Sequence, residues 1–143
     1  MILYLDTSSL VKLYVPEPDA DIVKKLVAEA ASVVTSRITC PEFYSAVTRR
    51  LNSKEITRKK YELLCAAFSA DWQRMYALDF DEIEAGRLVC KHGLRGADAI
   101  HLASARLLAC YDTSLEIVFS SADRKLNEAA EKEGFTLEFE QRL

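Results

Sequence analysis

The first ten residues constrain the fold of this chain more than any other stretch. An apolar run, Ile2–Leu5, ends at Asp6, three hydroxyl residues follow at positions 7–9, and apolar residues resume at Leu10. This pattern predicts a short buried strand, which presents one carboxylate at its carboxyl end and leads at once into a helix. In open α/β sheets, ligands bind in the crevice outside the carboxyl ends of the strands. If Asp6 marks such a site, other polar groups should converge on it from later strand ends and helix starts.

Apolar runs and helical periods alternate along the rest of the chain. We expect strands over residues 2–5, 33–34, 76–80, 115–119 and 135–139. We expect helices over residues 10–14, 19–31, 40–51, from 57 onward, 81–92, 97–110 and from 123 to 133. Strands separated by helices predict an α/β fold, a three-layer α/β/α arrangement with a central, mostly parallel sheet. The length of 143 residues fits one domain, spanning residues 1–143.

The composition excludes several classes of protein. Half of the residues are hydrophobic and 29% are charged, an ordinary balance for a globular protein. No apolar run approaches the roughly 20 residues of a membrane span, and the N-terminus lacks a basic signal-peptide region, so we expect a cytoplasmic protein without a membrane partner. Zinc fingers and disulfide scaffolds need closer cysteine spacing than this chain has, so its cysteines are expected to be buried free thiols. These cysteines are Cys40, Cys65, Cys90 and Cys110.

One segment departs from the acidic balance of the chain. Between Arg49 and Lys60, six basic residues stand against one acid, Glu55, which gives that segment a charge of +5. The six are Arg49, Arg50, Lys54, Arg58, Lys59 and Lys60. Because the whole chain carries −3, the remainder must carry −8. The helix periods place this basic segment at the tip of a helical hairpin, where it is either a solvated turn or a surface that binds phosphates.

Four acids can meet at one edge of the expected sheet. Asp6 and Asp123 follow buried strands, whereas Glu42 and Asp98 lie in the first turns of helices. Each acid alone could serve only the helix dipole, a contribution of roughly 0.3–1 kcal/mol. Asp98, however, lies in a nearly all-apolar helix, and a buried carboxylate must be paired or must bind a cation. No fixed Lys or Arg partner is evident in the sequence for Asp6 or Asp98.

Clustered carboxylates indicate a divalent cation. Without one they repel each other, and oxygen-only ligands favour Mg²⁺ or Mn²⁺ over zinc. Such a site serves phosphodiester hydrolysis, in which the ion activates water and stabilises the leaving oxygen. A haloacid-dehalogenase-type phosphatase would need an acid at position 8, and a receiver domain would need an acid pair near the end of the first strand. Ser8 and Thr7 exclude these two classes, and neither a P-loop nor a dinucleotide fingerprint is present.

The motifs around these acids resemble a known family over essentially the whole chain. The segments Asp6–Leu10, Arg95–Ala103 and Ser121–Asp123, with Glu42 between them, are similar to PIN domains and more narrowly to the VapC toxins of type II toxin–antitoxin systems. By position, Asp6, Glu42 and Asp98 match the family's three core metal ligands, and Asp123 matches its more variable fourth acid. Ser8 and Ser121 match hydroxyl positions that support the acids, although the family often has Thr where Ser121 stands.

The resemblance implies an Mg²⁺- or Mn²⁺-dependent endoribonuclease. It also implies a homodimer, an RNA substrate and neutralisation by a small VapB-type antitoxin, which occupies the groove beside the acids. Two alternatives stay open. One is an RNA-processing PIN nuclease without an antitoxin, and the other is a non-catalytic PIN-like module that binds RNA or protein.

Several further residues are candidates for contact with RNA or with the antitoxin. They are Lys12, Arg49, Arg50, Lys54, Arg95 and His101. Arg95 could touch a phosphate or could equally bond a helix end. His101 lies one helical turn after Asp98, on the same side of the helix, so it could take part in proton transfer or be a structural histidine near the site.

Overall fold

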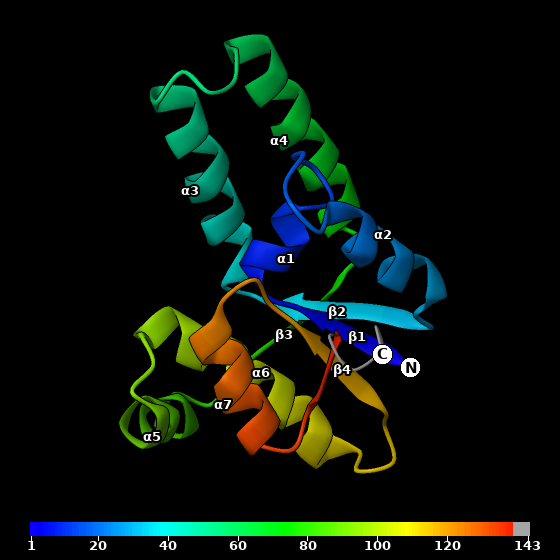
Figure 1. Cartoon of the computed structure of the whole chain (residues 1–143), viewed down its shortest axis with the longest axis vertical. Coiled ribbons are helices and arrows are strands. Elements are labelled where there is room, and N and C mark those ends of the chain that lie inside the picture. Colours follow the sequence, from blue (N-terminus) through cyan, green and yellow to red (C-terminus); the bar gives the residue numbers. More distant parts are fainter. Residues whose placement is uncertain (139–143) are drawn as a thin grey trace.

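The computed structural model describes residues 1–138 and shows strands alternating with helices (Figure 1). The strands are β1 (Ile2–Leu5), β2 (Ser32–Ser36), β3 (Tyr76–Leu78), β4 (Ile117–Ser120) and β5 (Thr136–Leu137). The helices are α1 (Thr7–Val11), α2 (Ala20–Glu29), α3 (Thr39–Asn52), α4 (Arg58–Trp72), α5 (Glu82–His92), α6 (Gly96–Tyr111) and α7 (Arg124–Lys132). No helix in this part of the chain is long and apolar enough to cross a membrane.

The strands form one sheet in the order β3-β2-β1-β4-β5, and all four pairings are parallel. The chain builds outward from β1 to β3 on one side and from β4 to β5 on the other. The order therefore reverses between β1 and β4, which pair from Ile2 with Ile117 to Leu5 with Ser120. In doubly wound folds, ligands bind at this reversal, outside the carboxyl ends of the strands. Asp6 follows β1 at that position, and Ser121 follows β4.

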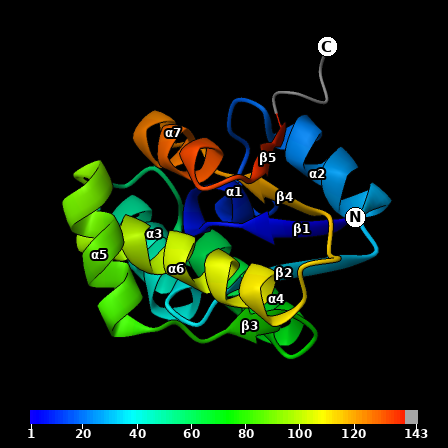
Figure 2. The same ribbon diagram turned by 90° about the horizontal axis from the view of Figure 1, so that it is seen from below.

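Helices cover both faces of the sheet, so the three-layer α/β/α fold is confirmed. Figure 1 shows α1–α4 above the strands and α5–α7 below them, and Figure 2 shows the lower layer from beneath. Leu3 and Leu5 pack with Phe43 and Phe68 from α3 and α4. Tyr4 points the other way and packs in the core that α5, α6 and α7 cover. Alternation along β1 thus sends neighbouring side chains into two separate cores.

Side-chain caps begin several helices where the sequence places them. Thr57 accepts a hydrogen bond from the backbone N–H of Lys60 at the start of α4. Asp81 accepts bonds from two backbone N–H groups at the start of α5, which ends at Gly93 with a φ of 65°. The hairpin of α3 and α4 rises away from the sheet, and the basic segment forms its tip (Figure 1). The predicted place of that segment is confirmed.

Several expected element boundaries differ from those in the structure, among them the following. The first short helix begins at Thr7 rather than Leu10, because Asp6 caps it directly. The helix expected over residues 19–31 is α2 (Ala20–Glu29), and Asp19 precedes it in a left-handed backbone conformation with a φ of 67°. Strand β5 covers Thr136–Leu137, and Phe139, the expected end of that strand, lies outside the described residues.

The cysteines are free, as expected, but the prediction that they are buried is wrong. Cys40 and Cys65 are half-buried, while Cys90 and Cys110 are exposed. The reason is the rotation of each helix about its axis. Leu88 sets the buried face of α5, so Cys90 falls on the opposite side of the same helix.

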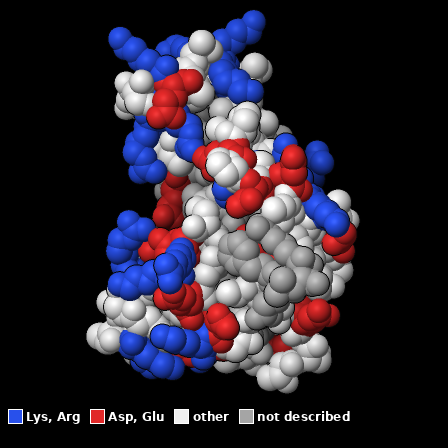
Figure 3. Space-filling model, in the orientation of Figure 1, with Lys and Arg blue, Asp and Glu red and all other residues white. Residues whose placement is uncertain are grey.

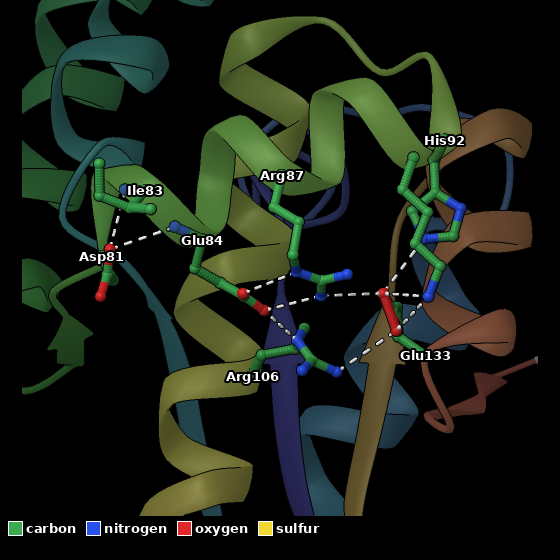
Figure 4. Close-up of polar contacts among 8 residues, drawn as sticks. Asp81, Ile83, Glu84, Arg87, His92, Arg106 and Glu133 are labelled. Carbon is green, nitrogen blue, oxygen red and sulfur yellow. Dashed lines mark hydrogen bonds and ion pairs between the residues drawn. The ribbon is translucent and has the colours of Figure 1, made fainter.

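An ion-pair network joins α5 and α6 to the end of α7 (Figure 4). Arg87 donates to Glu84 at 3.0 Å, and Arg106 of α6 also bonds Glu84. Glu133 accepts from Lys91 at 3.2 Å and from Arg106 at 3.4 Å. None of these residues lines the cavity described next, so the network serves the packing of the helices.

Candidate active site

A cavity of about 350 Å³ opens at the reversal point of the sheet. All four predicted acids line it: Asp6, Glu42, Asp98 and Asp123. They come from the end of β1, the first turn of α3, the first turn of α6 and the start of α7. Parallel strands bring their carboxyl ends to one edge, and each following helix starts there. The predicted convergence of the four acids on one place is what the fold produces.

Asp6 is buried and held by three donors. Its Oδ1 accepts from Ser8 Oγ at 2.7 Å and from the backbone N–H of Ser9 at 2.9 Å, while Ser121 Oγ donates to Oδ2. Ser8 Oγ in turn accepts from the backbone N–H of Ala122. Burial raises the pKa of Asp6, although the bonds from Ser121 and Ser8 act in the opposite direction. A cation nearby would offset this cost of burying the charged form.

Glu42 shares one of its oxygens between two donors. Thr7 Oγ1 donates to Oε1 at 2.7 Å, and His101 Nε2 lies 2.7 Å from the same oxygen. Burial acts to raise the pKa of Glu42, but the hydrogen bonds from His101 and Thr7 outweigh it and leave the pKa below its usual value. Glu42 is therefore an ionised acceptor at neutral pH.

Asp98 and Asp123 share a single arginine. Arg95 Nε donates to Asp98 Oδ2 at 3.2 Å, and Arg95 Nη2 lies 3.7 Å from Asp123 Oδ2. Asp123 also caps α7 by accepting from the backbone N–H of Leu126. No fixed basic partner of Asp98 was evident in the sequence, but the turn before α6 places Arg95 over the first turn of that helix, beside Asp98. The guanidinium is 81% exposed, so this cation can leave the two acids without disturbing the core.

The predicted basic contacts separate into two groups. Arg49 lines the cavity, and its charge acts on Glu42. Arg50 also lines the cavity but is paired with Glu17. Lys12 is buried, lies 3.6 Å from the same glutamate and donates a hydrogen bond to a backbone carbonyl. Both therefore fasten the loop after α1 in place. Figure 3 shows Lys and Arg side chains gathered over the tip of the α3–α4 hairpin. Lys54 lies in the turn between these two helices.

Two site residues were not among the predicted ones. Thr7 bonds Glu42, and Tyr4 Oη lies 2.8 Å from His101 Nδ1. The hydroxyl run after Asp6 carried a signal for Thr7, because its hydroxyl immediately follows the acid. The signal for Tyr4 was weaker, because a tyrosine in a buried strand usually serves only to pack the core.

The residues present fit a divalent cation in kind. The donors are carboxylate oxygens, which Mg²⁺ and Mn²⁺ prefer, and one cationic group already lies between Asp98 and Asp123. With the side chains of residues 1–138 placed as they are, no three His, Cys, Asp or Glu residues are gathered so that they could hold a metal ion together. The acids thus share a cavity, while Arg95 bridges Asp98 and Asp123 and other donors hold Asp6 and Glu42 separately.

Comparison with known proteins shows the family of this chain. The sequence profile of the PIN domain matches residues 3–132, so the chain belongs to the PIN-domain family. Within that family it is similar to Ribonuclease VapC45 and Ribonuclease VapC49 of Mycobacterium tuberculosis, each 31% identical over 140 residues. These matches cover 93% of this chain and 92% of each relative. The resemblance found in the sequence is confirmed.

Solved structures support the fold. FitAcB from Neisseria gonorrhoeae matches with a TM-score of 0.66 and 20% identity over 96% of each chain. PAE2754 from Pyrobaculum aerophilum matches with a TM-score of 0.57 and 16% identity, covering 99% of this chain and 95% of that one. At these identities the likeness concerns the architecture alone.

Proposed function

We propose that this protein is an endoribonuclease toxin that hydrolyses RNA phosphodiester bonds with Mg²⁺ or Mn²⁺. The observation that carries the proposal is the set of four carboxylates around one cavity, in a chain similar to two VapC ribonucleases. Asp6, Glu42, Asp98 and Asp123 would hold the cation. Bound there, the cation would activate water and stabilise negative charge on the scissile phosphate.

The chain's own residues would prepare that site. Ser8 and Ser121 hold the Asp6 carboxylate in one orientation, so little ordering remains when a cation binds. Arg95 would exchange its two carboxylates for an RNA phosphate, which a guanidinium binds through paired hydrogen bonds. Arg49, at the wall of the same cavity, would bind a neighbouring phosphate.

The substitution Asp98→Asn tests the proposal. It removes one charge at nearly constant volume, so RNA cleavage and growth arrest should fall by at least about 100-fold while the fold survives. Asp79→Asn is the matched control, because Asp79 also follows a strand, is 71% exposed and does not line the cavity. Cleavage of a structured cellular RNA in Mg²⁺, with and without EDTA, is the measurement. An Asp98→Asn protein that cuts at the wild-type rate would refute the metal-site assignment.

The proposal includes two partners. A small VapB-type antitoxin would occupy the groove beside the acids, and two copies of this chain would form a homodimer in the cytoplasm. A short reading frame overlapping the start of this gene, whose product blocks cleavage on co-expression, would support the antitoxin. Light scattering of the purified chain measures its molar mass in solution and so tests the homodimer. An RNA-processing nuclease without an antitoxin would instead leave growth unaffected at expression levels that give full cleavage activity in vitro.

A binding module is the second candidate function. The basic tip of the hairpin is the observation in its favour, because a surface of that charge binds phosphates without any catalysis. Such a module would keep its affinity for RNA and show no cleavage with any divalent ion. Mapping new 5′ ends in cellular RNA after expression, with Asp98→Asn as the control, separates the two functions.

A further inference from the structure

A continuous line of hydrogen bonds, buried at Tyr4 and partly buried at Glu42, runs from the first strand to Glu42. Tyr4 Oη lies 2.8 Å from His101 Nδ1, and His101 Nε2 lies 2.7 Å from Glu42 Oε1. Thr7 Oγ1 closes the line, at 2.7 Å from the same Glu42 oxygen and 3.1 Å from His101 Nε2. These contacts join β1, α6, α3 and α1, which include three of the elements that carry the acids.

The hydrogen-bonding capacity of each group determines the direction of the line. An ionised carboxylate only accepts, so the hydrogen between His101 and Glu42 must be on Nε2. Thr7 gives its single hydroxyl hydrogen to Glu42, so it too faces Nε2 as an acceptor. The imidazole of His101 therefore donates its Nε2–H to Glu42 whether the ring is neutral or charged. The other ring nitrogen, Nδ1, is the one in hydrogen-bond contact with Tyr4 Oη.

Packing leaves the two rings little freedom. Tyr4 is fully buried and stacks on Phe119, with ring centroids 5.1 Å apart and planes 5° from parallel. His101 is 2% exposed and meets Tyr4 edge-on at 78°. A ring fixed at one nitrogen by a fixed hydroxyl cannot turn about its bond to the chain. The Nε2–H group then stays aimed at the first turn of α3.

We propose that Tyr4 and His101 form a positioning pair that orients the Glu42 carboxylate toward a divalent cation in the cavity. Both observed side-chain bonds to Glu42 end on Oε1, which leaves Oε2 for the cation. Partners of this kind, outside the ligands themselves, fix ligand orientation in metal sites and typically change metal affinity by about 10–100-fold. The inference rests on the proposed metal-dependent function and adds to it two residues that act through Glu42.

The substitution Tyr4→Phe tests the pair, because it removes the hydroxyl and keeps the ring that stacks on Phe119. Titration of the metal-free full-length chain with Mn²⁺, followed by electron paramagnetic resonance, should show Kd raised about tenfold. Tyr14→Phe is the matched control, since the Tyr14 hydroxyl bonds Asp71 at 2.6 Å outside the cavity, and its Kd should equal that of the wild type. Thermal unfolding confirms that each variant is folded.

Two variants of His101 separate positioning from simple packing. His101→Gln keeps an N–H donor near the Nε2 position and should retain Mn²⁺ affinity to within about threefold, whereas His101→Leu should lose about 10–100-fold. Nitrogen-15 NMR of the metal-free protein should place a hydrogen on Nε2. A neutral ring with its hydrogen on Nδ1 alone would refute the proposed direction of the line.

The outcomes distinguish this inference from the proposed function. Wild-type affinity for Mn²⁺ that persists unchanged in Tyr4→Phe would overturn the positioning pair and leave the metal site intact. Wild-type protein that binds no Mn²⁺ would overturn the metal site, and the positioning pair with it.

Discussion

At the scale of single residues, Asp6 is subject to opposing requirements. Its carboxylate would have to stay charged to hold the proposed cation, yet burial raises the pKa of this group and disfavours the charge. The native metal-free protein therefore binds more protons here than the unfolded chain does at pH values just above the usual pKa of 3.8. By linkage, stability falls as pH rises through that window and does not recover above it.

Asp6→Asn should accordingly stabilise the metal-free protein at pH 7 while abolishing activity. The neutral amide removes the cost of burying a charge, and we expect a gain of about 1 kcal/mol, a common size for substitutions that trade function for stability. Urea unfolding in EDTA at pH 7 measures it, with the exposed Asp79→Asn as the control. A destabilised variant would mean that the three donors to Asp6 contribute more than its burial costs.

The sequence alone was sufficient to predict the four acids and their convergence on one edge of the sheet. The reason is that residue type, and position after a strand or at a helix start, are local properties. It was insufficient for the contacts between side chains. Arg95 pairs with Asp98 only because of the backbone path of the turn before α6. Tyr4 meets His101 only because β1 alternates in one phase and α6 presents one face to it. The contact of Tyr4 with His101 depends on how distant elements pack, and the pairing of Arg95 depends on the path of a turn; the sequence alone specifies neither.

At the scale of elements, α5, α6 and the end of α7 are joined by charges as well as by apolar packing (Figure 4). The hydrogen bond from Arg87, supported by Arg106, lowers the pKa of Glu84 from 4.5 to about 2. Because the folded-state pKa lies below the unfolded one, this contribution to stability is present above about pH 4.5 and is lost as pH falls toward 2.

Glu84→Gln should destabilise the protein by about 1 kcal/mol at pH 7, a value that allows for solvent screening of a partly exposed group. The difference from the wild type should shrink between pH 5 and pH 2 as the Glu84 carboxylate becomes protonated. Urea unfolding at several pH values measures both effects. Glu128→Gln is the control, because Glu128 is 53% exposed and pairs within α7 alone. A constant difference at every pH would show that packing, not charge, joins these helices.

Element boundaries show the same division between local and distant causes. Caps at Thr57 and Asp81 were predictable because a cap bonds residues two or three positions away. The exposure of Cys110 was not, since the nearly all-apolar sequence of α6 does not reveal which face of that helix is buried.

At the scale of the whole molecule, the tip of the α3–α4 hairpin is a basic surface at one end of the longest axis (Figure 3). The hairpin segment 49–60 carries +5 and the rest of the chain −8. Helix α3 connects the two regions, because Glu42 lies in its first turn at the cavity and Asn52 ends it at the basic tip. The ten residue steps from Glu42 to Asn52 span about 15 Å along the axis. A strand of RNA held at the acids could therefore extend along α3 to the tip.

Reversing two charges at the tip should weaken RNA binding without changing the chemistry. In the Asp98→Asn background, which should leave RNA uncut, Arg58→Glu with Lys59→Glu should raise the Kd for RNA on the order of tenfold and lower its salt dependence. Each lost phosphate contact should reduce the slope of log K against log salt by about 0.7 for single-stranded RNA. In the wild-type background, KM should rise and kcat should stay the same, because these side chains lie away from the cavity.

Lys24→Glu with Lys25→Glu provides the matched control for that experiment. Both lysines are exposed on α2, so this pair changes the net charge equally without touching the hairpin. If the control weakens binding as much as the tip variant, the effect is one of overall charge and not of contact. If neither variant changes the Kd, the tip is a solvated turn and RNA approaches the acids from another side. If only the tip variant loses affinity for RNA, and its binding depends less on salt, α3 and the hairpin tip bind the RNA backbone.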